Sequence, residues 1–194
     1  MTPKTAQGGA FNQTAFVIQQ FLNKVQTSTL VQVVAVSEDG QFVDVLPMVN
    51  QIDGAGNAVP HVTIYNVPCF RYQGGSNAVT IRPVIGDIGP ALFASRDLTK
   101  VKNTRAVGNP GSLRTFSYSD ALYIGGMLNG EPTQHITLDA SGITIHSPIG
   151  IVLEAPSITI TGPLTITGDL TQTGDIALDG SMLATGTVHA SNIP

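Results

Sequence analysis

Few residues in this 194-residue sequence have the type and spacing that enzymatic or metal chemistry requires. The single cysteine, Cys69, excludes an internal disulfide and a zinc site built from several cysteines. We expect its thiol to be a small buried apolar side chain. His61, His135 and His146 have no second ligand at a metal-binding spacing, so we expect these histidines to be solvated or structural.

Patterns for catalysis are equally sparse. The three glutamates, Glu38, Glu131 and Glu154, are too scattered to predict a pair of carboxylates held in one cleft. The Gly54-Ala55-Gly56 turn lacks the Lys-Ser/Thr pair that completes a phosphate-binding loop. No Ser-His-Asp arrangement stands out, and Cys69 has no convincing base. We therefore predict that the protein is not an enzyme and takes no small-molecule substrate.

The charged and aromatic residues divide the sequence into two regions of different character. All nine lysines and arginines lie at or before Arg114, where they outnumber six acids. From Thr115 onward there are seven acids and no base, and no aromatic residue follows Tyr123. Such a split predicts two kinds of structure within one chain. No apolar run approaches the roughly 20 residues that span a bilayer, and no signal-peptide pattern is visible, so we expect synthesis in a cytoplasm.

Hydrophobic periodicity predicts a short helix followed by a small β-domain. Residues 11–25 place Ile18 and Leu22 at helical spacing, which predicts an amphipathic helix that packs on the same domain or on a neighbouring subunit. The stretches TLVQVVAVS, QFVDVLP, HVTIYNVPCFRY, AVTIRPV and GDIGPALFAS read as strands between turn residues. Five strands in about 70 residues predict a small closed barrel of the OB type.

The predicted organisation has four parts. They are an N-terminal helical segment over 1–28, the OB-type domain over 29–101, an irregular collar with a further strand over 102–134, and a C-terminal repeat over 135–194.

The internal repeat is the strongest pattern in the sequence. It begins with ITLDASG and ITIHSPIG and settles to a six-residue period in ITITGP, LTITGD, LTQTGD, IALDGS and MLATGT. The first and third positions of these units are mostly apolar, the second and fourth are mostly polar, and the fifth is glycine. Each unit is therefore expected to be a short strand with one apolar face, followed by a turn in which glycine takes a positive φ.

One such strand buries almost nothing alone, whereas three chains wound about a common axis would bury their apolar faces in a shared core. A disordered tail is the alternative, but disorder does not keep Ile and Leu at alternating positions. We therefore predict an all-β homotrimer whose C-terminal part is a triple-stranded intertwined β-helix. The predicted core positions are Ile143, Ile145, Ile151, Leu153, Ile158, Ile160, Leu164, Ile166, Leu170, Gln172, Ile176, Leu178, Met182, Ala184 and Val188.

Two details of the core positions predict its shape and polarity. Ala184 and Ala190 are small, so we expect the shared core to taper toward its end. Gln172 is the one polar residue in an inward position, where three copies would hydrogen-bond as a ring or hold water, because an unpaired buried amide is costly.

Four stretches ahead of the repeat carry a resemblance to a known family. They are Val67–Gly75 (VPCFRYQGG), Ile81–Gly89 (IRPVIGDIG), Phe93–Leu98 (FASRDL) and Phe116–Ala121 (FSYSDA). In this order, and followed by the repeat, they resemble the central spike, or membrane-piercing tip, of contractile-tailed bacteriophage baseplates. The resemblance covers most of residues 29–188 and implies an OB domain joined to a trimeric β-helix. Some members also carry a lysozyme domain, for which this sequence has no room.

The resemblance implies partners and a place of action. The barrel would dock on the threefold hub of the baseplate, at the tip of the tail in the virion. The trimeric β-helix, which we call the needle, would be driven through the host outer membrane when the tail sheath contracts. Its contact with the membrane would therefore be transient. Many members end in a His-x-His pair that binds an axial iron. Here only His189 is kept, and three copies on the axis would supply three imidazoles to iron or another metal ion, whereas strict alternation would send His189 outward.

Two other functions remain open. A nucleic-acid-binding protein with an OB fold would need a basic groove with exposed aromatic residues, of which Arg71, Tyr72 and Arg82 are a hint. The excess of basic over acidic residues before Thr115 is too small to bind nucleic acid, so we expect no nucleic acid among the partners. A receptor-binding or polysaccharide-binding tail spike also uses trimeric β-structure, but it would show aromatic residues for sugar stacking beyond Tyr123.

Overall fold

The computed structural model describes residues 9–188, and the chain divides between Pro148 and Ile149 into two compact units. Every helix and strand assigned in the described residues belongs to the first unit. The described residues of the second unit, 149–188, carry no assigned helix or strand. This boundary lies within the predicted C-terminal repeat of residues 135–194 rather than at its start.

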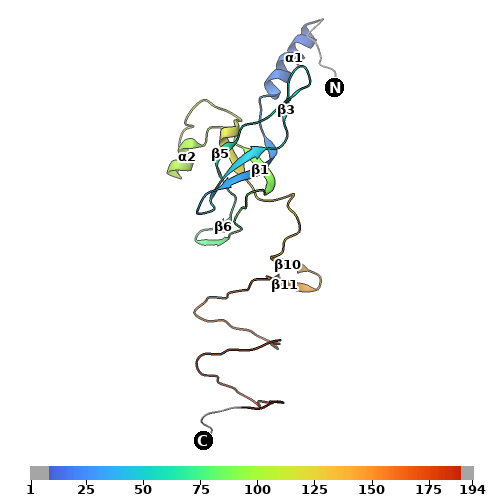
Figure 1. Cartoon of the computed structure of the whole chain (residues 1–194). Helices are drawn as coiled ribbons and strands as arrows, with labels where there is room; N and C mark the ends of the chain where they lie inside the picture. The colour runs from blue at the N-terminus through green and yellow to red at the C-terminus, as the bar shows by residue number, and fades with distance from the viewer. Residues whose placement is uncertain (1–8, 189–194) are drawn as a thin grey trace. The chain divides into compact units, whose positions relative to one another are not determined.

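Five strands of the first unit form one antiparallel sheet that is nearly closed on itself. They are β1 (Ser28–Val36), β2 (Phe42–Pro47), β5 (Ile64–Pro68), β8 (Ile88–Phe93) and β9 (Ala121–Tyr123), in the spatial order β5-β2-β1-β8-β9. Figure 1 labels β1 and β5 of this sheet. The fourth strand along the chain returns beside the first, which is a Greek-key arrangement. The two edges meet because Phe70 N donates a hydrogen bond of 2.7 Å to Tyr123 O, and Cys69 forms a parallel bridge with Tyr123. The result is barrel-like.

Alternation along the strands fills the inside of this barrel. Val31 and Val33 of β1 and Val43 and Val45 of β2 are each at most 1% exposed. The register of β1 against β2 shifts after Val33, and such a bulge bends a strand and increases its twist, which helps the sheet to curl. The buried apolar residues are Val31, Val33, Val43, Val45, Ile64, Val67, Ala91, Phe93, Ala121 and Tyr123.

Short elements precede the barrel strands or join them. They are α1 (Ala10–Leu22), β3 (Gln51–Ile52), β4 (Ala58–Val59), β6 (Tyr72–Gly74), β7 (Asn77–Val79), α2 (Thr99–Thr104) and the 3-10 turn η1 (Tyr118–Asp120). β3 and β4 form a hairpin between β2 and β5, and β6 and β7 form another between β5 and β8. Figure 1 shows the first hairpin at the end of the barrel near α1 and the second at the opposite end.

The predicted N-terminal helix is confirmed, but the last barrel strand is not the expected one. The stretch AVTIRPV contributes only its first residues to the β6–β7 hairpin, because Pro83 has no N–H and Gly86 turns the chain at a φ of 99°. β9 closes the barrel instead, and it lies in the collar segment over 102–134, where we expected a further strand but not a strand of the barrel. The barrel therefore extends to Tyr123 rather than ending near residue 101.

The first two units of the repeat pair with each other in a hairpin. β10 (His135–Asp139) runs antiparallel to β11 (Gly142–His146), with Ile136 opposite Ile145 and Leu138 opposite Ile143. The turn is held by Asp139, whose Oδ1 accepts a hydrogen bond of 2.8 Å from Ser141 N. Ile143 and Ile145, two predicted core positions, thus share one face of the hairpin with the apolar residues of β10.

Candidate functional site

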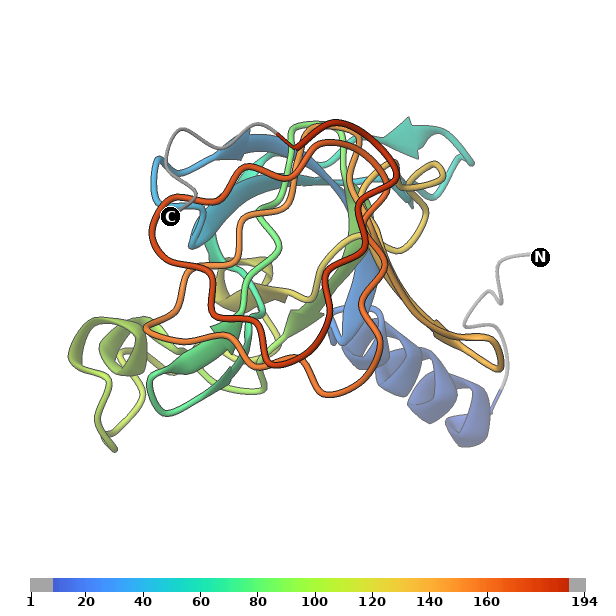
Figure 2. The ribbon, with the colours of Figure 1, turned by 90° about the horizontal axis from the view of Figure 1, so that it is seen from below.

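The second unit carries the apolar side of the repeat on an extended backbone. Figure 2 shows its trace, in orange to red, as extended segments joined by bends. The predicted core positions of this unit that are apolar and larger than alanine are between 52% and 71% exposed, and we call them the apolar stripe. The stripe consists of Ile151, Leu153, Ile158, Ile160, Leu164, Ile166, Leu170, Ile176, Leu178, Met182 and Val188.

Glycine sets bends in this unit at a constant interval. Gly162, Gly168, Gly174 and Gly180 follow one another every six residues and have φ values of 123°, 122°, 108° and 143°. Residues with a Cβ rarely adopt this conformation, whereas glycine does so at little cost. The predicted positive φ is therefore confirmed at these four glycines, but not at Gly186 in the fifth unit.

Exposure alternates along the extended segments as the repeat predicts. Ile151 and Leu153 are 54% and 70% exposed, while Val152 between them is 88% exposed. At the other end of the unit, Met182 is 71% exposed and the next residue, Leu183, is 89% exposed. The residues of the stripe thus point to the more sheltered side of the backbone, and their neighbours in the sequence point away from it.

The stripe and its backbone lack partners within the described chain. Residues 151–188 make no backbone–backbone hydrogen bond among the described residues. Completing the burial of one Ile or Leu of the stripe would stabilise the protein by roughly 1–2 kcal/mol. Extended backbone with unpaired N–H and C=O groups is also a template for pairing with another chain. Both the apolar side chains and the backbone groups of these residues therefore remain available for contacts with another chain.

The two remaining core positions of this unit, Gln172 and Ala184, are exposed in the single chain. Gln172 Nε2 donates a hydrogen bond of 3.3 Å to the carbonyl of its neighbour, Thr173. Its amide is thus free to turn toward other copies at the cost of one local contact. Val188 is the last described residue of the repeat, and His189 and Ala190 lie outside the described residues.

An arginine clasp links the segment before β9 to the connection between β8 and α2. Arg114 Nε donates to Asp120 Oδ2 at 2.7 Å, and its Nη2 lies 2.9 Å from Asp97 Oδ1. The two aspartates are almost fully buried, at 5% exposure for Asp97 and 1% for Asp120. Asp120 also accepts from Leu98 N at 2.9 Å, and Asp97 from Ser112 Oγ at 2.7 Å. The clasp holds β9 against the rest of the barrel.

Hydrogen bonds control the ionisation of the clasp. Bonds from Thr99 and Ser112, helped by the charge of Arg114, hold the pKa of Asp97 well below its usual range. Burial raises the pKa of Asp120, but the hydrogen bonds from Arg114 and from Leu98 N lower it by more, so the net pKa is lowered. The hydrogen bond to Asp120 in turn raises the pKa of Arg114. All these groups are therefore charged at neutral pH, which suits a structural ion-pair network.

The stretch GDIG, part of the resemblance, forms a tight corner before β8. Gly86 takes a φ of 99°, and the carboxylate of Asp87 accepts a hydrogen bond of 2.9 Å from Asn129 Nδ2. A Cβ at Gly89 would lie 1.8 Å from the carbonyl oxygen of Gly125, so only glycine allows the two backbones to approach. These residues have a structural role in closing the barrel, as do Asp97 and Asp120.

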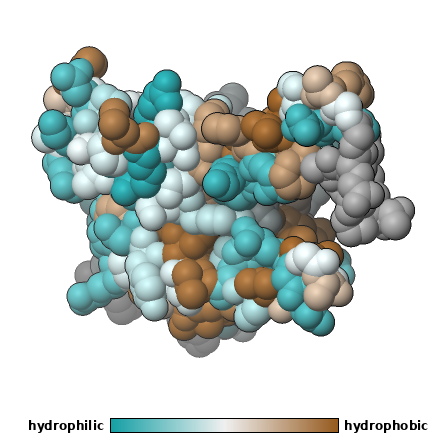
Figure 3. Space-filling view, turned by 90° about the horizontal axis from the view of Figure 1, so that it is seen from above, coloured by the Kyte–Doolittle hydropathy of each residue, from teal (hydrophilic) through white to brown (hydrophobic). Residues whose placement is uncertain are grey.

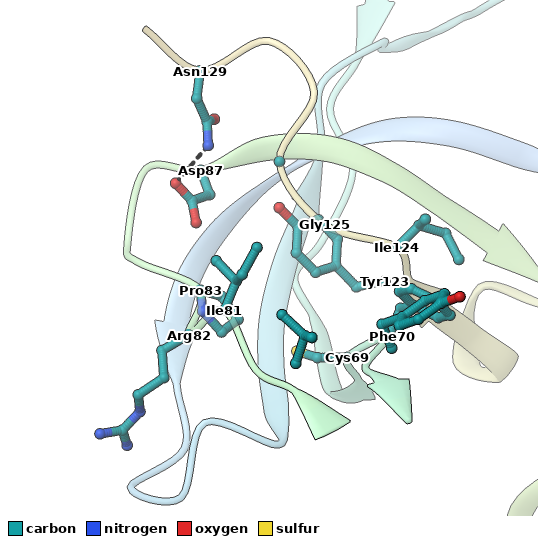
Figure 4. A pocket seen from close by; sticks show the side chains of 13 residues that line it. Cys69, Phe70, Ile81, Arg82, Pro83, Asp87, Tyr123, Ile124, Gly125 and Asn129 are labelled. Carbon is teal, nitrogen blue, oxygen red and sulfur yellow. Dashed lines mark hydrogen bonds between the residues drawn. The ribbon is translucent and has the colours of Figure 1, made fainter. Parts of the chain in front are cut away.

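A cavity of about 370 Å³ opens beside the closure of the barrel (Figure 4). Cys69, Phe70, Ile81 and Ile124 supply much of its apolar wall. The hydroxyl of Tyr123 is buried without a hydrogen-bond partner among the described residues, and burial raises its pKa to about 12. Burial also raises the pKa of the Cys69 thiol to about 11, which makes it a weak nucleophile. Arg82, Asp87 and Asn129 contribute polar side chains to the same lining.

Helix α1 leaves its apolar residues uncovered. Phe11 is 83% exposed, Phe21 71% and Leu22 58%, and no residue of the helix is buried. The prediction that the helix packs on its own domain is therefore wrong, and packing on a neighbouring subunit stays a prediction. In the view from above, Figure 3 shows separate apolar patches between hydrophilic residues. Among the described residues, no helix has the length and apolar character that crossing a bilayer requires.

The histidines differ from expectation in one respect. The sequence spacing of His135 and His146 did not predict that they are neighbours, but the hairpin places them opposite each other with ring centroids 5.3 Å apart. His61 lies 3.0 Å from the carbonyl of Val49 and packs on Tyr118, in agreement with a structural role. Across residues 9–188, no group of three or more His, Cys, Asp or Glu residues could hold a metal ion.

Comparisons with known proteins give no identification. No protein-family model matches the sequence, and no curated protein is significantly similar to it. The functional argument therefore depends on the geometry of the chain itself.

Proposed function

We propose that the chain is a mechanical central spike of a contractile tail, a homotrimer with an OB-type mount and a C-terminal piercing needle. The observation that carries this proposal is the repeat of the second unit, whose apolar stripe is uncovered while its glycine corners recur every six residues with similar φ values. A single chain with one short extended segment per corner cannot cover such a stripe. Three chains around one axis would bury it and pair their backbones at the same time.

The barrel is suited to be the mount. Its five strands in Greek-key order, nearly closed into a barrel, match the description of an OB-type domain. The arginine clasp and the GDIG corner hold its last strand in place. All basic residues and all aromatic residues lie in this unit, and aromatic residues and arginine are enriched in protein interfaces. We infer that the mount, and not the needle, docks on the baseplate hub.

The surface chemistry of the needle supports passage through a membrane. No base follows Arg114, so the needle has little attraction for an anionic lipid surface. With the stripe turned toward the axis, the positions between its members, mostly Thr, Asp and Ser, would face the solvent and leave no large apolar patch to hold the needle in lipid. The host outer membrane is the target that the resemblance implies.

The assembly is tested by one pair of substitutions on adjacent residues of the repeat. Ile166→Asp would place three charges near the axis, and an unpaired buried charge costs several kcal/mol, so we expect monomers. Thr165→Asp, on the outward side, should leave the trimer intact. Light scattering coupled to size exclusion should give three times 20.2 kDa for the unmodified chain. A monomer at micromolar concentration, or equal effects of the two substitutions, would contradict the proposed trimer.

The piercing role is tested in virions. A chain that ends after Pro148 keeps the whole first unit, so it should still be incorporated into the baseplate. The phage should nevertheless infect poorly, because the needle is missing. Spike incorporation and infectivity are measured on the same particles. Full infectivity without residues 149–194 would refute piercing even if the trimer were confirmed.

A further inference from the structure

Two histidines on the hairpin β10–β11 have no part in the proposed mechanics. His135 and His146 are direct partners in the antiparallel register, and their rings are nearly parallel, with 29° between the planes. His135 Nδ1 is buried and has no hydrogen-bond partner among the described residues. His135 is partly buried and His146 is exposed, so the pair is accessible from solvent on one side.

The spacing of the two imidazoles suits chelation. Directly opposite residues of an antiparallel pair have Cβ atoms about 4.5–5.5 Å apart, and the ring centroids here are 5.3 Å apart. Imidazole binds Zn, Cu, Fe and Ni, with nitrogen–zinc distances of about 2.0–2.1 Å. Small rotations about the side-chain torsions would therefore bring one nitrogen of each ring to the same ion.

Other groups on this face of the hairpin do not compete for the imidazoles. Thr137 and Thr144 form the next pair along the same face, and Asp139 follows. The Asp139 carboxylate accepts hydrogen bonds from Ser141, which also lower its pKa and keep it engaged at the turn. The histidine pair thus stands alone as a ligand set of nitrogen atoms.

We propose that His135 and His146 form a two-histidine site for a divalent transition-metal ion, chelated across β10 and β11, with water at the remaining positions. The site is distinct from His189, it occurs once in each chain, and it does not require the trimer. Because only a neutral imidazole binds a metal ion, protons compete and binding weakens in acid.

Calorimetric titration of NiCl₂ into untagged, metal-free full-length protein tests the site. The parent protein for this experiment carries His189→Ala, and so does every variant, so that the C-terminal histidine does not contribute. We expect about one Ni²⁺ per chain, and an affinity that falls about 10- to 100-fold in His146→Ala, since one of two tethered ligands is lost. His61→Ala is the matched control and should bind Ni²⁺ as the parent does. Absence of Ni²⁺ binding by the parent, or unchanged affinity in His146→Ala, would overturn the proposal.

Hydrogen exchange separates chelation from binding by a single histidine. An ion held by both strands should slow amide exchange over residues 135–146 in the parent but not in His146→Ala. The exposed position of His146 makes it a substitution that leaves the hairpin core unchanged. Exchange that Ni²⁺ does not slow in the parent would overturn the chelate.

Discussion

Replacing Asp120 with asparagine weakens the arginine clasp by a predictable amount. The Asp120 carboxylate is 1% exposed and accepts hydrogen bonds from Arg114 Nε at 2.7 Å, Arg114 Nη2 at 2.9 Å and Leu98 N at 2.9 Å. An asparagine keeps one acceptor oxygen, but its NH₂ group would face a donor. Asp120→Asn therefore removes one charge-assisted bond and leaves a guanidinium N–H unsatisfied.

The surroundings of Arg114 determine how much free energy of unfolding is lost in Asp120→Asn. Breaking a buried ion pair by removing one partner costs about 3–5 kcal/mol. Arg114 is one-third exposed and keeps Asp97 as a partner at 2.9 Å, so we expect the lower end of that range. About 3 kcal/mol corresponds to a fall in melting temperature of roughly 6–12 °C for a unit of this size.

Tyrosine fluorescence provides the assay. Because no aromatic residue follows Tyr123, the signal reports unfolding of the first unit alone, even in the full chain. Glu131→Gln is the control, since it removes the same charge from an exposed residue that makes no hydrogen bond or ion pair in the described structure. If Asp120→Asn and Glu131→Gln melt at the same temperature, the clasp does not stabilise the barrel and the reasoning is wrong.

Three further predictions concern the same unit. Hydrogen bonds lower the carboxyl pKa values of Asp97 and Asp120, so the stability that these carboxylates give the barrel should be complete above about pH 5 and be lost progressively below about pH 4. A melting temperature that stays constant down to about pH 2.5 would contradict this. Gly89→Ala should lower the melting temperature by more than Gly54→Ala, since the added Cβ would lie 1.8 Å from a backbone oxygen at Gly89 and would meet nothing within 4 Å at Gly54. Equal losses would show that the backbone contact at Gly89 does not exclude a Cβ. Cys69, with its pKa raised to about 11, should react with iodoacetamide at pH 8 on the order of 100-fold more slowly in the native than in the denatured protein, as followed by mass spectrometry, and similar rates would contradict its burial.

Local patterns in the sequence were sufficient for some elements and not for others. β1 and β2 alternate clearly and are joined by a Gly40 turn, so both were predicted correctly. A further strand was expected in the collar, where β9 lies, but its place as the last strand of the barrel is set by contacts with Cys69 and Phe70 that are distant in the sequence. The sequence therefore predicts the type of domain better than the strand that closes it.

Among the site residues, too, local features could be predicted from the sequence, whereas contacts between distant residues could not. The glycine corners of the repeat depend on backbone conformation at single positions, which the sequence shows directly. The role of Arg114 depends on Asp97, which is distant in the sequence, and the pairing of His135 with His146 depends on the register across a turn. Neither can be read from spacing alone. The trimer and its shared core remain predictions, because they involve contacts between copies.

The late position of β9 has a consequence for synthesis on the ribosome. The barrel lacks its closing strand until Tyr123 has been added, and a further 71 residues follow. At about 5–20 residues per second, those residues take roughly 4–14 s to translate, which is long compared with the folding time of most small domains. Each nascent chain can therefore complete its barrel before most of the apolar stripe has been made. The apolar stripe then emerges attached to a folded domain, and in the proposed trimer the association with two further chains would begin only after that domain is finished.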